Sequence, residues 1–300
     1  MGNNFEKNKK KVSIVIPSWF LPEHCGKYGK YETWMIASIC LKRMLENTPR
    51  ELVEYIIIDN GSRLTDDEVL DEFLNPNCSW KFTERDEFFT PSEYFAQADI
   101  LIKNTDNLGF GKAMNQGIAL SRCPYIVAAN NDIVVWDGWV ESMIKDFESN
   151  NPQFEKPIGA LMSNLIKSCY QTDCLNEKGR LDFYKSINLK KEQINLPHKD
   201  IKEPGAEMGS FFMFTKELAN KISNLRDGYQ FYDEDYKVGF GEDRNLWKEM
   251  RMLGYETYRT SEFRTLHVGG CSMSKIKNEP EIRKMIDNNR IILKERWNNK

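Results

Sequence analysis

Three polar residues interrupt an apolar stretch at residues 124–139, whose sequence is PYIVAANNDIVVWDGW. The first apolar run ends on Asn130, Asn131 and Asp132, and a second apolar run begins directly after them. A buried strand gains nothing in packing from an acid at its end, because acids are rarely buried unless they have a partner. These side chains are therefore candidates for contact with a polar ligand.

Polar residues follow three further apolar runs in the same way. They are Pro17 and Ser18, then Asp59 and Asn60, and then residues 104–107. In an open parallel sheet the carboxyl ends of the strands lie along one edge, where ligands bind. One polar strand end is ordinary loop chemistry, but four in succession predict a polar ligand across that edge.

A glycine-rich segment, NLGFGK (107–112), precedes a helical pattern. It does not match GxxxxGK[ST], because Asp106 and Ala113 occupy the positions for Gly and for Ser or Thr, and Met114 excludes GxGxxG. It nevertheless places backbone amides and Lys112 at the start of a helix, which favours an anion. A plain glycine-rich turn is the alternative.

The sequence GEDR begins another helical pattern with two acids. Glu242 and Asp243 would stand in its first turn, where the helix macrodipole favours negative charge, so capping is one interpretation. A carboxylate that serves as a general base is the other. By residue type alone, His267 is a structural histidine, and His24 and His198 are interpreted as surface or loop residues.

Strands that alternate with helices position these residues. Continuous apolar runs predict strands at 12–17, 54–62, 99–104, 124–130, 158–163 and 210–215, and helical spacing predicts helices at 31–48, 107–122, 139–148, 241–254 and 281–297. The alternation in the first half indicates βαβ units and a mostly parallel sheet, so the fold class is α/β. We expect one continuous domain over residues 12–297 and a disordered basic tail at 1–11.

The composition limits the function classes. A net charge of −3 and a pI near 5.8 give no electrostatic case for nucleic acid as a partner. The basic run EKNKKK (6–11) is a frayed terminus or a contact for anionic lipid. No apolar run approaches the ~18 residues of a spanning helix, and no signal-peptide core is present, so a soluble, cytoplasmic protein is expected. The seven cysteines contain no CxxC, which favours reduced thiols over a zinc site or disulfides.

Taken together and in order, the motifs resemble those of family-2 glycosyltransferases with the GT-A fold. They are VSIVIPSW, IIIDNGS, NLGFGKAMNQG, NND, MGSFFMFTKEL, FGEDRNLWKEMRMLGY and HVGG. Each motif is weak alone, but the order of all of them is specific, and the resemblance extends over about residues 12–297. The subtype that the chain resembles is the rhamnosyltransferase-like bacterial one, whose members build surface polysaccharides.

The resemblance implies a metal site. NND stands where the family has Asp-x-Asp or Asn-x-Asp, whose acid holds Mn²⁺ or Mg²⁺ against the two phosphates of a sugar nucleotide. Asp132 is then the metal ligand, and His267 matches the late histidine that completes the metal shell in several members. Asn130 departs from Asp-x-Asp and would face the ribose or bind the metal through water, and Asn131 joins the residues that contact the nucleotide.

The resemblance also assigns the remaining site residues. Asp59 matches the acid that pairs with the nucleobase or its ribose. The other matches to nucleotide-contacting positions are Pro17, Ser18, Asn107, Gly109, Lys112 and Asn115. Asp243 matches the catalytic base, with Glu242 as the second candidate, because Asn245 stands where the family often has another acid. Residues 12–136 would bind the nucleotide sugar, and residues 137–297 would bind the acceptor and carry the base.

The implied reaction is a single inverting displacement. Asp243 takes a proton from an acceptor hydroxyl, which attacks the anomeric carbon opposite the diphosphate, while the metal and Lys112 stabilise the departing charge. The expected donor is a UDP- or dTDP-sugar. The expected acceptor is a glycan or a lipid-linked saccharide, met in the cytoplasm or at the inner face of the membrane. The alternatives are a non-catalytic sugar-nucleotide-binding relative and a nucleotidyltransferase, although the latter would need a basic glycine-rich loop after the first strand.

For two segments the sequence allows two roles each. Phe211, Phe212 and Phe214 in MGSFFMF either shape the acceptor side or belong to the core. The segment 18–34 is longer than the usual link between the first strand and helix, and it is either a lid or a tolerated insertion.

Overall fold

The computed structural model describes residues 10–23, 31–75, 88–149, 154–167, 209–237, 240–268 and 279–297. Three features of the sequence lie outside these ranges. They are residues 1–9 of the basic tail, residues 24–30 of the long first loop with His24, and His198. Among the helices in these ranges, none combines the length and the apolar character of a membrane span.

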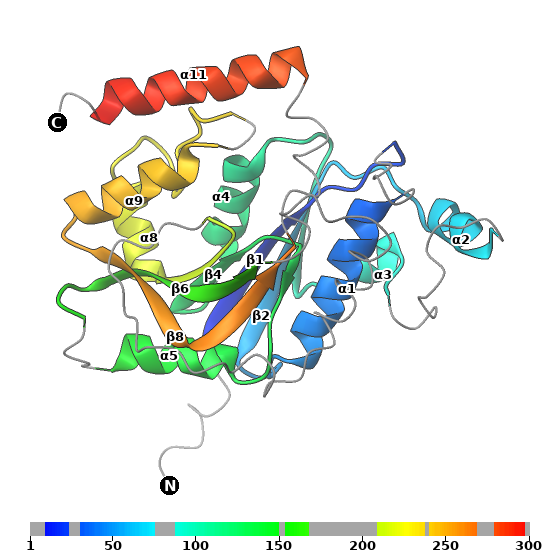
Figure 1. Ribbon diagram of the computed structural model, residues 1–300, viewed down its shortest axis with the longest axis horizontal. Helices are drawn as coiled ribbons and strands as arrows, with labels where there is room; N and C mark the ends of the chain where they lie inside the picture. The colour runs from blue at the N-terminus through cyan, green and yellow to red at the C-terminus, as the bar shows by residue number, and fades with distance from the viewer. Residues whose placement is uncertain are drawn as a thin grey trace, which may run out of the picture.

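An eight-stranded mixed sheet forms the centre of the fold (Figure 1). In spatial order its strands are β3 (Ile100–Asn104), β2 (Val53–Asn60), β1 (Val12–Ser18), β4 (Tyr125–Ala129), β7 (Phe211–Thr215), β6 (Ile158–Lys167), β8 (Glu256–His267) and β5 (Ile133–Val134). The first four strands in this order run parallel, as predicted. β7 runs antiparallel to β4 and β6, and β5 runs antiparallel to β8. The mostly parallel α/β fold is therefore confirmed.

Helices cover both faces of the sheet (Figure 1). One hydrophobic cluster contains α1 (Glu32–Glu46), α3 (Pro91–Phe95), α5 (Trp139–Glu148) and Val69 of α2 (Asp66–Leu74), and the other contains α4 (Phe110–Leu120), α8 (Lys216–Ser223) and α9 (Glu242–Met252). Successive residues of β1 alternate between the clusters: Ile14 and Ile16 belong to the first, and Val15 to the second. Burial on both faces explains why these strands are continuous apolar runs.

The phenylalanines of β7 belong to the core. Phe211, Phe212 and Phe214 are all 0% exposed. The ring of Phe212 meets Trp247 edge-on at 4.8 Å, and the ring of Phe214 stacks on Phe231 at 4.3 Å. Of the two interpretations of MGSFFMF, the structure therefore supports core packing for these three rings.

The last helix, α11 (Pro280–Trp297), lies outside α9 and α4 (Figure 1). Its buried residue Asn289 donates hydrogen bonds to the carbonyl oxygens of Lys237 at 2.8 Å and Phe240 at 3.1 Å. Trp297 Nε1 donates to Asn245 Oδ1 at 2.9 Å. α11 is thereby bonded both to the segment that precedes α9 and to α9 itself.

Candidate active site

The carboxyl ends of the parallel strands form one polar edge. Ser18 of β1 is paired in register with Asp59 of β2, and Asn60 of β2 is paired with Asn104 of β3. The polar residues that end these strands are thus brought side by side, at the edge where ligands bind in such sheets.

Asp132 and His267 lie together at this edge. Asp132 is 5% exposed, and His267 Nε2 lies 3.3 Å from Asp132 Oδ1. The contact is built by the backbone, because Ile133 of β5 pairs with His267 of β8 and Val268 N donates to Asp132 O at 3.1 Å. Burial lowers the pKa of His267, but the Asp132 carboxylate more than offsets this, so that the pKa is raised overall.

Asn130 completes this cluster, which we call the metal-side cluster (Asn130, Asp132 and His267). Asn130 Nδ2 lies 3.5 Å from His267 Nε2, and Asn130 Oδ1 is buried without a hydrogen-bond partner among the described residues. Asn131 is half-buried between Asn130 and Asp132. No group of three or more His, Cys, Asp or Glu side chains that could hold a metal ion occurs in the described part of the chain. The cluster thus offers one carboxylate, one imidazole and one amide oxygen, a small donor set suited to a cation that is shared with phosphate oxygens.

A buried hydroxyl pair lies behind this cluster, and the sequence analysis missed it. Ser18 Oγ is hydrogen-bonded to Tyr94 OH of α3 at 2.8 Å, so the Ser18 hydroxyl points into the core. Burial raises the pKa of Tyr94 and of Cys40, and the charge of Asp132 raises both further. Tyr94 and Cys40 therefore lie close enough to Asp132 to feel its charge. Pro17, one residue before Ser18, is half-buried.

An amide network shapes the loop after β3. Asn60 donates to Asn107 Oδ1 at 2.8 Å and accepts from Leu108 N at 3.1 Å. Asn104 donates to Asn60 Oδ1 at 3.0 Å and exchanges two 2.9 Å hydrogen bonds with Gln116. The sequence indicates only that Asn60 stands at a strand end. The structure gives it the central position in the network.

Two glycines and a turn allow the loops to approach each other. Gly61 has φ +85°, and a Cβ there would lie 2.6 Å from the backbone of Asp106. Asp59 Oδ1 accepts from Ser62 N at 2.9 Å, which fixes the same turn. Gly109 has φ 85° at the start of α4, and its N–H donates to Asn107 Oδ1 at 2.9 Å.

Lys112 and Asn115 of α4 both contact the segment before α9. Lys112 Nζ lies 3.7 Å from Glu234 Oε2, and half of its side chain is exposed. Asn115 Nδ2 donates to Tyr232 O, and Asn115 Oδ1 accepts from Tyr232 N, both at 2.8 Å. The side chain of Asn115 is thus used to hold the Tyr232 backbone.

The two acids of α9 lie at its first turn. Asp243 is half-buried, and its Oδ1 accepts from Arg244 N at 2.7 Å. Glu242 is buried, and burial and the neighbouring Asp243 charge raise its pKa to about 8. Asn245 Oδ1 accepts from Trp297 Nε1 and from Tyr236 OH at 3.4 Å, so this position has a structural role.

The residues before β7 connect the acids to the metal-side cluster. A Cβ on Gly209 would lie 2.9 Å from Asp243 Oδ2, so Asp243 occupies the space that a side chain at 209 would need. Asn130 N donates to Ser210 O at 2.8 Å. Residues 209 and 210 thus lie between the metal-side cluster and Asp243, and they contact both. In the sequence MGSFFMF stands out for its aromatic residues, and nothing there indicates this role of the Gly-Ser pair.

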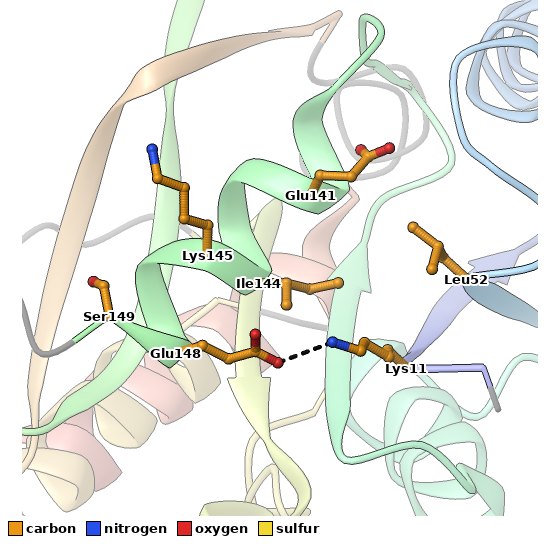
Figure 2. Close-up of a pocket in the computed structure, with 7 residues that line it drawn as sticks. All are labelled: Lys11, Leu52, Glu141, Ile144, Lys145, Glu148 and Ser149. Atoms are coloured by element: carbon orange, nitrogen blue, oxygen red, sulfur yellow. Dashed lines mark hydrogen bonds and ion pairs between the residues drawn. The ribbon is translucent and has the colours of Figure 1, made fainter. Parts of the chain in front are cut away.

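A hollow of about 480 Å³ lies at the opposite edge of the sheet (Figure 2). Its lining residues are Lys11, Leu52, Glu141, Ile144, Lys145, Glu148 and Ser149. Lys11 and Leu52 stand before β1 and β2, and Lys11 Nζ forms an ion pair with Glu148 Oε1 at 3.1 Å. The hollow is therefore separate from the polar edge.

Comparison with known proteins places the chain in a family. The family model described as glycosyl transferase family 2 matches residues 34–223, which is more than half of the chain. A search of curated proteins found no match. Among solved structures, GalNAc-T7 with UDP, GalNAc and Mn²⁺ has a TM-score of 0.50 and 14% identity, over 86% of this chain and 43% of that one. S. aureus TarS 1–349 has a TM-score of 0.48 and 12% identity, over 93% of this chain and 65% of that one.

The chain thus spans less than two thirds of the length of both of these structures. The likeness to GalNAc-T7 concerns the fold, in which helices flank a mostly parallel mixed sheet. On the family match and this fold, the chain belongs to glycosyl transferase family 2 and has the GT-A fold.

Proposed function

We propose that this glycosyltransferase moves a sugar from a nucleoside diphosphate sugar to a hydroxyl of a glycan or lipid-linked saccharide, with inversion at the anomeric carbon. One observation carries the proposal: the Asp132–His267 pair and Asp243 lie at the same edge of one sheet, and residues 209–210 connect them. In an inverting displacement, the diphosphate leaving group and the base lie on opposite sides of the anomeric carbon. The Asp132–His267 pair would hold the diphosphate, and Asp243 would be the base.

The metal-side cluster fits Mn²⁺ or Mg²⁺. Asp132 and His267 would be the ligands, and the buried Asn130 Oδ1 would accept from the ribose or from a metal-bound water. The cation would neutralise charge on the departing diphosphate. The solved structure of GalNAc-T7, which has this fold, contains Mn²⁺ together with UDP.

Asp243 is the better candidate for the base. Glu242, with a pKa of about 8, carries a proton at neutral pH and cannot accept another on the same carboxylate. Asp243 is half-buried and therefore reachable by an acceptor hydroxyl. We therefore expect its neighbour Glu242 to bind substrate and not to act as the base.

The nucleotide would lie over the ends of β1, β2 and β4. Asp59 would meet the base or ribose, and Pro17, Asn107, Gly109 and Asn131 would surround it. Ser18 and Asn115 would act from behind, because Ser18 Oγ bonds to Tyr94 and Asn115 holds Tyr232. Lys112, at the start of α4, would exchange Glu234 for a phosphate oxygen.

The finer features of the proposal depend on the sequence resemblance. They are a UDP- or dTDP-sugar as the donor, a rhamnosyltransferase-like role in surface polysaccharide synthesis, a single domain over 12–297, and work in the cytoplasm or at the inner face of the membrane.

Calorimetric titration with UDP, dTDP and GDP, each with and without Mn²⁺, tests the proposal. We expect one nucleotide to bind tightly only with Mn²⁺, and the matching nucleotide sugar to be turned over. Binding without turnover of any donor would favour a non-catalytic relative. Binding of none of the three would refute the proposal.

A further inference from the structure

Four buried polar atoms at the active-site edge have no hydrogen-bond partner among the described residues. They are Asn130 Oδ1, Ser210 Oγ, Tyr232 Oη and Glu242 Oε2. Buried polar groups in folded proteins are nearly always hydrogen-bonded, because an unpaired one loses its water without compensation. Several unpaired atoms in one place therefore indicate a polar ligand that supplies the missing partners.

These atoms follow one path between the metal-side cluster and the acids. Asn130 N donates to Ser210 O at 2.8 Å, and the neighbouring Gly209 faces Asp243, with 2.9 Å between a Cβ built at 209 and Asp243 Oδ2. Tyr232 lies close enough to both acids of α9 that their charges, after burial, raise its pKa. The residues that carry these four atoms are thus linked from the metal-side cluster to the acids by a backbone contact, by Gly209 and by charge.

The Tyr232 ring is held rigidly in this place. Its backbone exchanges two 2.8 Å hydrogen bonds with Asn115, and its ring meets Phe110 edge-on at 5.6 Å. A Cβ on Gly111 would lie 3.3 Å from Tyr232 Cβ, so α4 approaches it closely. A hydroxyl on a ring fixed in this way is preorganised, and binding a ligand to it costs little ordering entropy.

We propose that the hydroxyls of Ser210 and Tyr232, together with the Glu242 carboxyl, form a subsite that hydrogen-bonds the ring hydroxyls of the transferred sugar. The inference rests on the proposed function and adds the residues that select the sugar. Ser210 and Glu242 are each 7% exposed and form the open side, and Tyr232, at 0%, forms the closed end.

The chemistry of the subsite matches a sugar ring. Hydroxyls both donate and accept, as sugar hydroxyls do, and none of the three side chains carries the positive charge that a phosphate would require. The anomeric carbon must lie between the metal-held diphosphate and Asp243, so the ring attached to it occupies this path. Sites with buried polar groups reject analogues that lack the matching hydroxyl, because those groups are then left unpaired.

Tyr232→Phe and Ser210→Ala test the inference, with Tyr55→Phe as the matched control. Tyr55 is also fully buried, and its hydroxyl contacts Met44 O at 3.5 Å and the side chain of Thr48, both residues outside the proposed subsite. Donor hydrolysis would be measured with Mn²⁺ for UDP-glucose, UDP-galactose, UDP-N-acetylglucosamine and dTDP-rhamnose. The affinity for UDP and dTDP and the melting temperature would be measured in parallel.

We expect kcat/KM for the preferred donor to fall about 10- to 100-fold in Tyr232→Phe, with weaker discrimination between donors that differ at one hydroxyl. Affinity for the free nucleotide should stay within about 2-fold, because the nucleotide does not reach the subsite. The melting temperature should be unchanged or higher, because an unpaired buried hydroxyl is removed. Tyr55→Phe should leave donor preference unchanged.

If both variants keep the wild-type kcat/KM and donor preference, the inference is wrong while the proposed function stands. If wild-type protein binds no nucleotide, both fall together. If Tyr232→Phe lowers the melting temperature strongly, Ser210→Ala decides, because its smaller change leaves ring packing intact.

Discussion

His267 Nε2 lies 3.3 Å from Asp132 Oδ1, and the two residues are brought together by the antiparallel pairing of β5 with β8. The short strand β5 thus aligns the end of NND with the segment that carries the histidine. A carboxylate and an imidazole in this position fit a shared cation better than a purely structural pair, because Asn130 Oδ1 beside them has no protein partner in the described ranges.

Asp132→Asn and His267→Ala should each weaken Mn²⁺-dependent nucleotide binding at least about 10-fold, because each removes a metal donor. Titration calorimetry with and without Mn²⁺ measures the effect. Asp137→Asn is the matched control, since Asp137 is an exposed acid in the same stretch. Equal losses with and without Mn²⁺ would show that these residues act on the fold and not on a metal.

Asp243→Asn should lower turnover about 10²- to 10⁴-fold, the usual contribution of a general base, and should leave nucleotide affinity unchanged. Glu242→Gln should have a smaller effect on turnover, because a protonated carboxyl and an amide are both neutral. Turnover is followed as release of the nucleoside diphosphate. Full activity in Asp243→Asn would refute the assignment of the base.

Glu242 should make stability fall with rising pH. Its folded-state pKa of about 8 exceeds the ordinary value of 4.5, so between these values the folded protein holds a proton that the unfolded chain has lost. Stability from this group is therefore lost as pH rises through that window, at no more than roughly 1.4 kcal/mol per pH unit.

Glu242→Gln should remove this dependence. Denaturant unfolding at pH 5 and pH 8.5 should show a variant that gains stability over wild type at the higher pH and has a flatter profile. Glu141→Gln, which changes an exposed glutamate of α5, should follow the wild-type profile. Parallel profiles for wild type and Glu242→Gln would contradict the raised pKa.

Gly209→Ala should impair turnover more than stability. The new Cβ would lie 2.9 Å from Asp243 Oδ2 and 3.1 Å from Asp243 Cβ, so the base must move. Gly228→Ala gives the opposite pattern and serves as control: nothing lies within 4 Å of its Cβ, but φ is +79°, so the cost falls on stability. Activity and melting temperature measured for both variants separate the two effects.

Much of the sheet could be predicted from the sequence, because strands buried on both faces are continuous apolar runs. The end of each such run marks the ligand-binding edge, which is why Asp59 and Asp132 stood out. The β8 segment, ETYRTSEFRTLH, has only three large apolar residues, Tyr258, Phe263 and Leu266, at irregular spacing and without a continuous run, and its strand was missed.

Contacts between distant side chains could not be predicted. Nothing local to Tyr94 indicates that its hydroxyl meets Ser18, and nothing local to Asn115 indicates that it holds Tyr232. The same holds for Gly209, whose requirement for a missing side chain arises only when α9 is placed beside it. Such residues are selected by the assembled fold, so sequence periodicity carries no signal for them.

The bonds from Asn289 and Trp297 to the start of α9 have a consequence for biosynthesis. The ribosome makes α11 after every strand of the sheet, yet α11 holds the carbonyl of Phe240, shortly before the proposed base. A nascent chain that contains the whole sheet but not yet α11 would lack these bonds. The segment that carries the proposed base would then not be held in place. Catalytic competence would arise only once α11 has left the exit tunnel, which would keep unfinished chains from consuming donor.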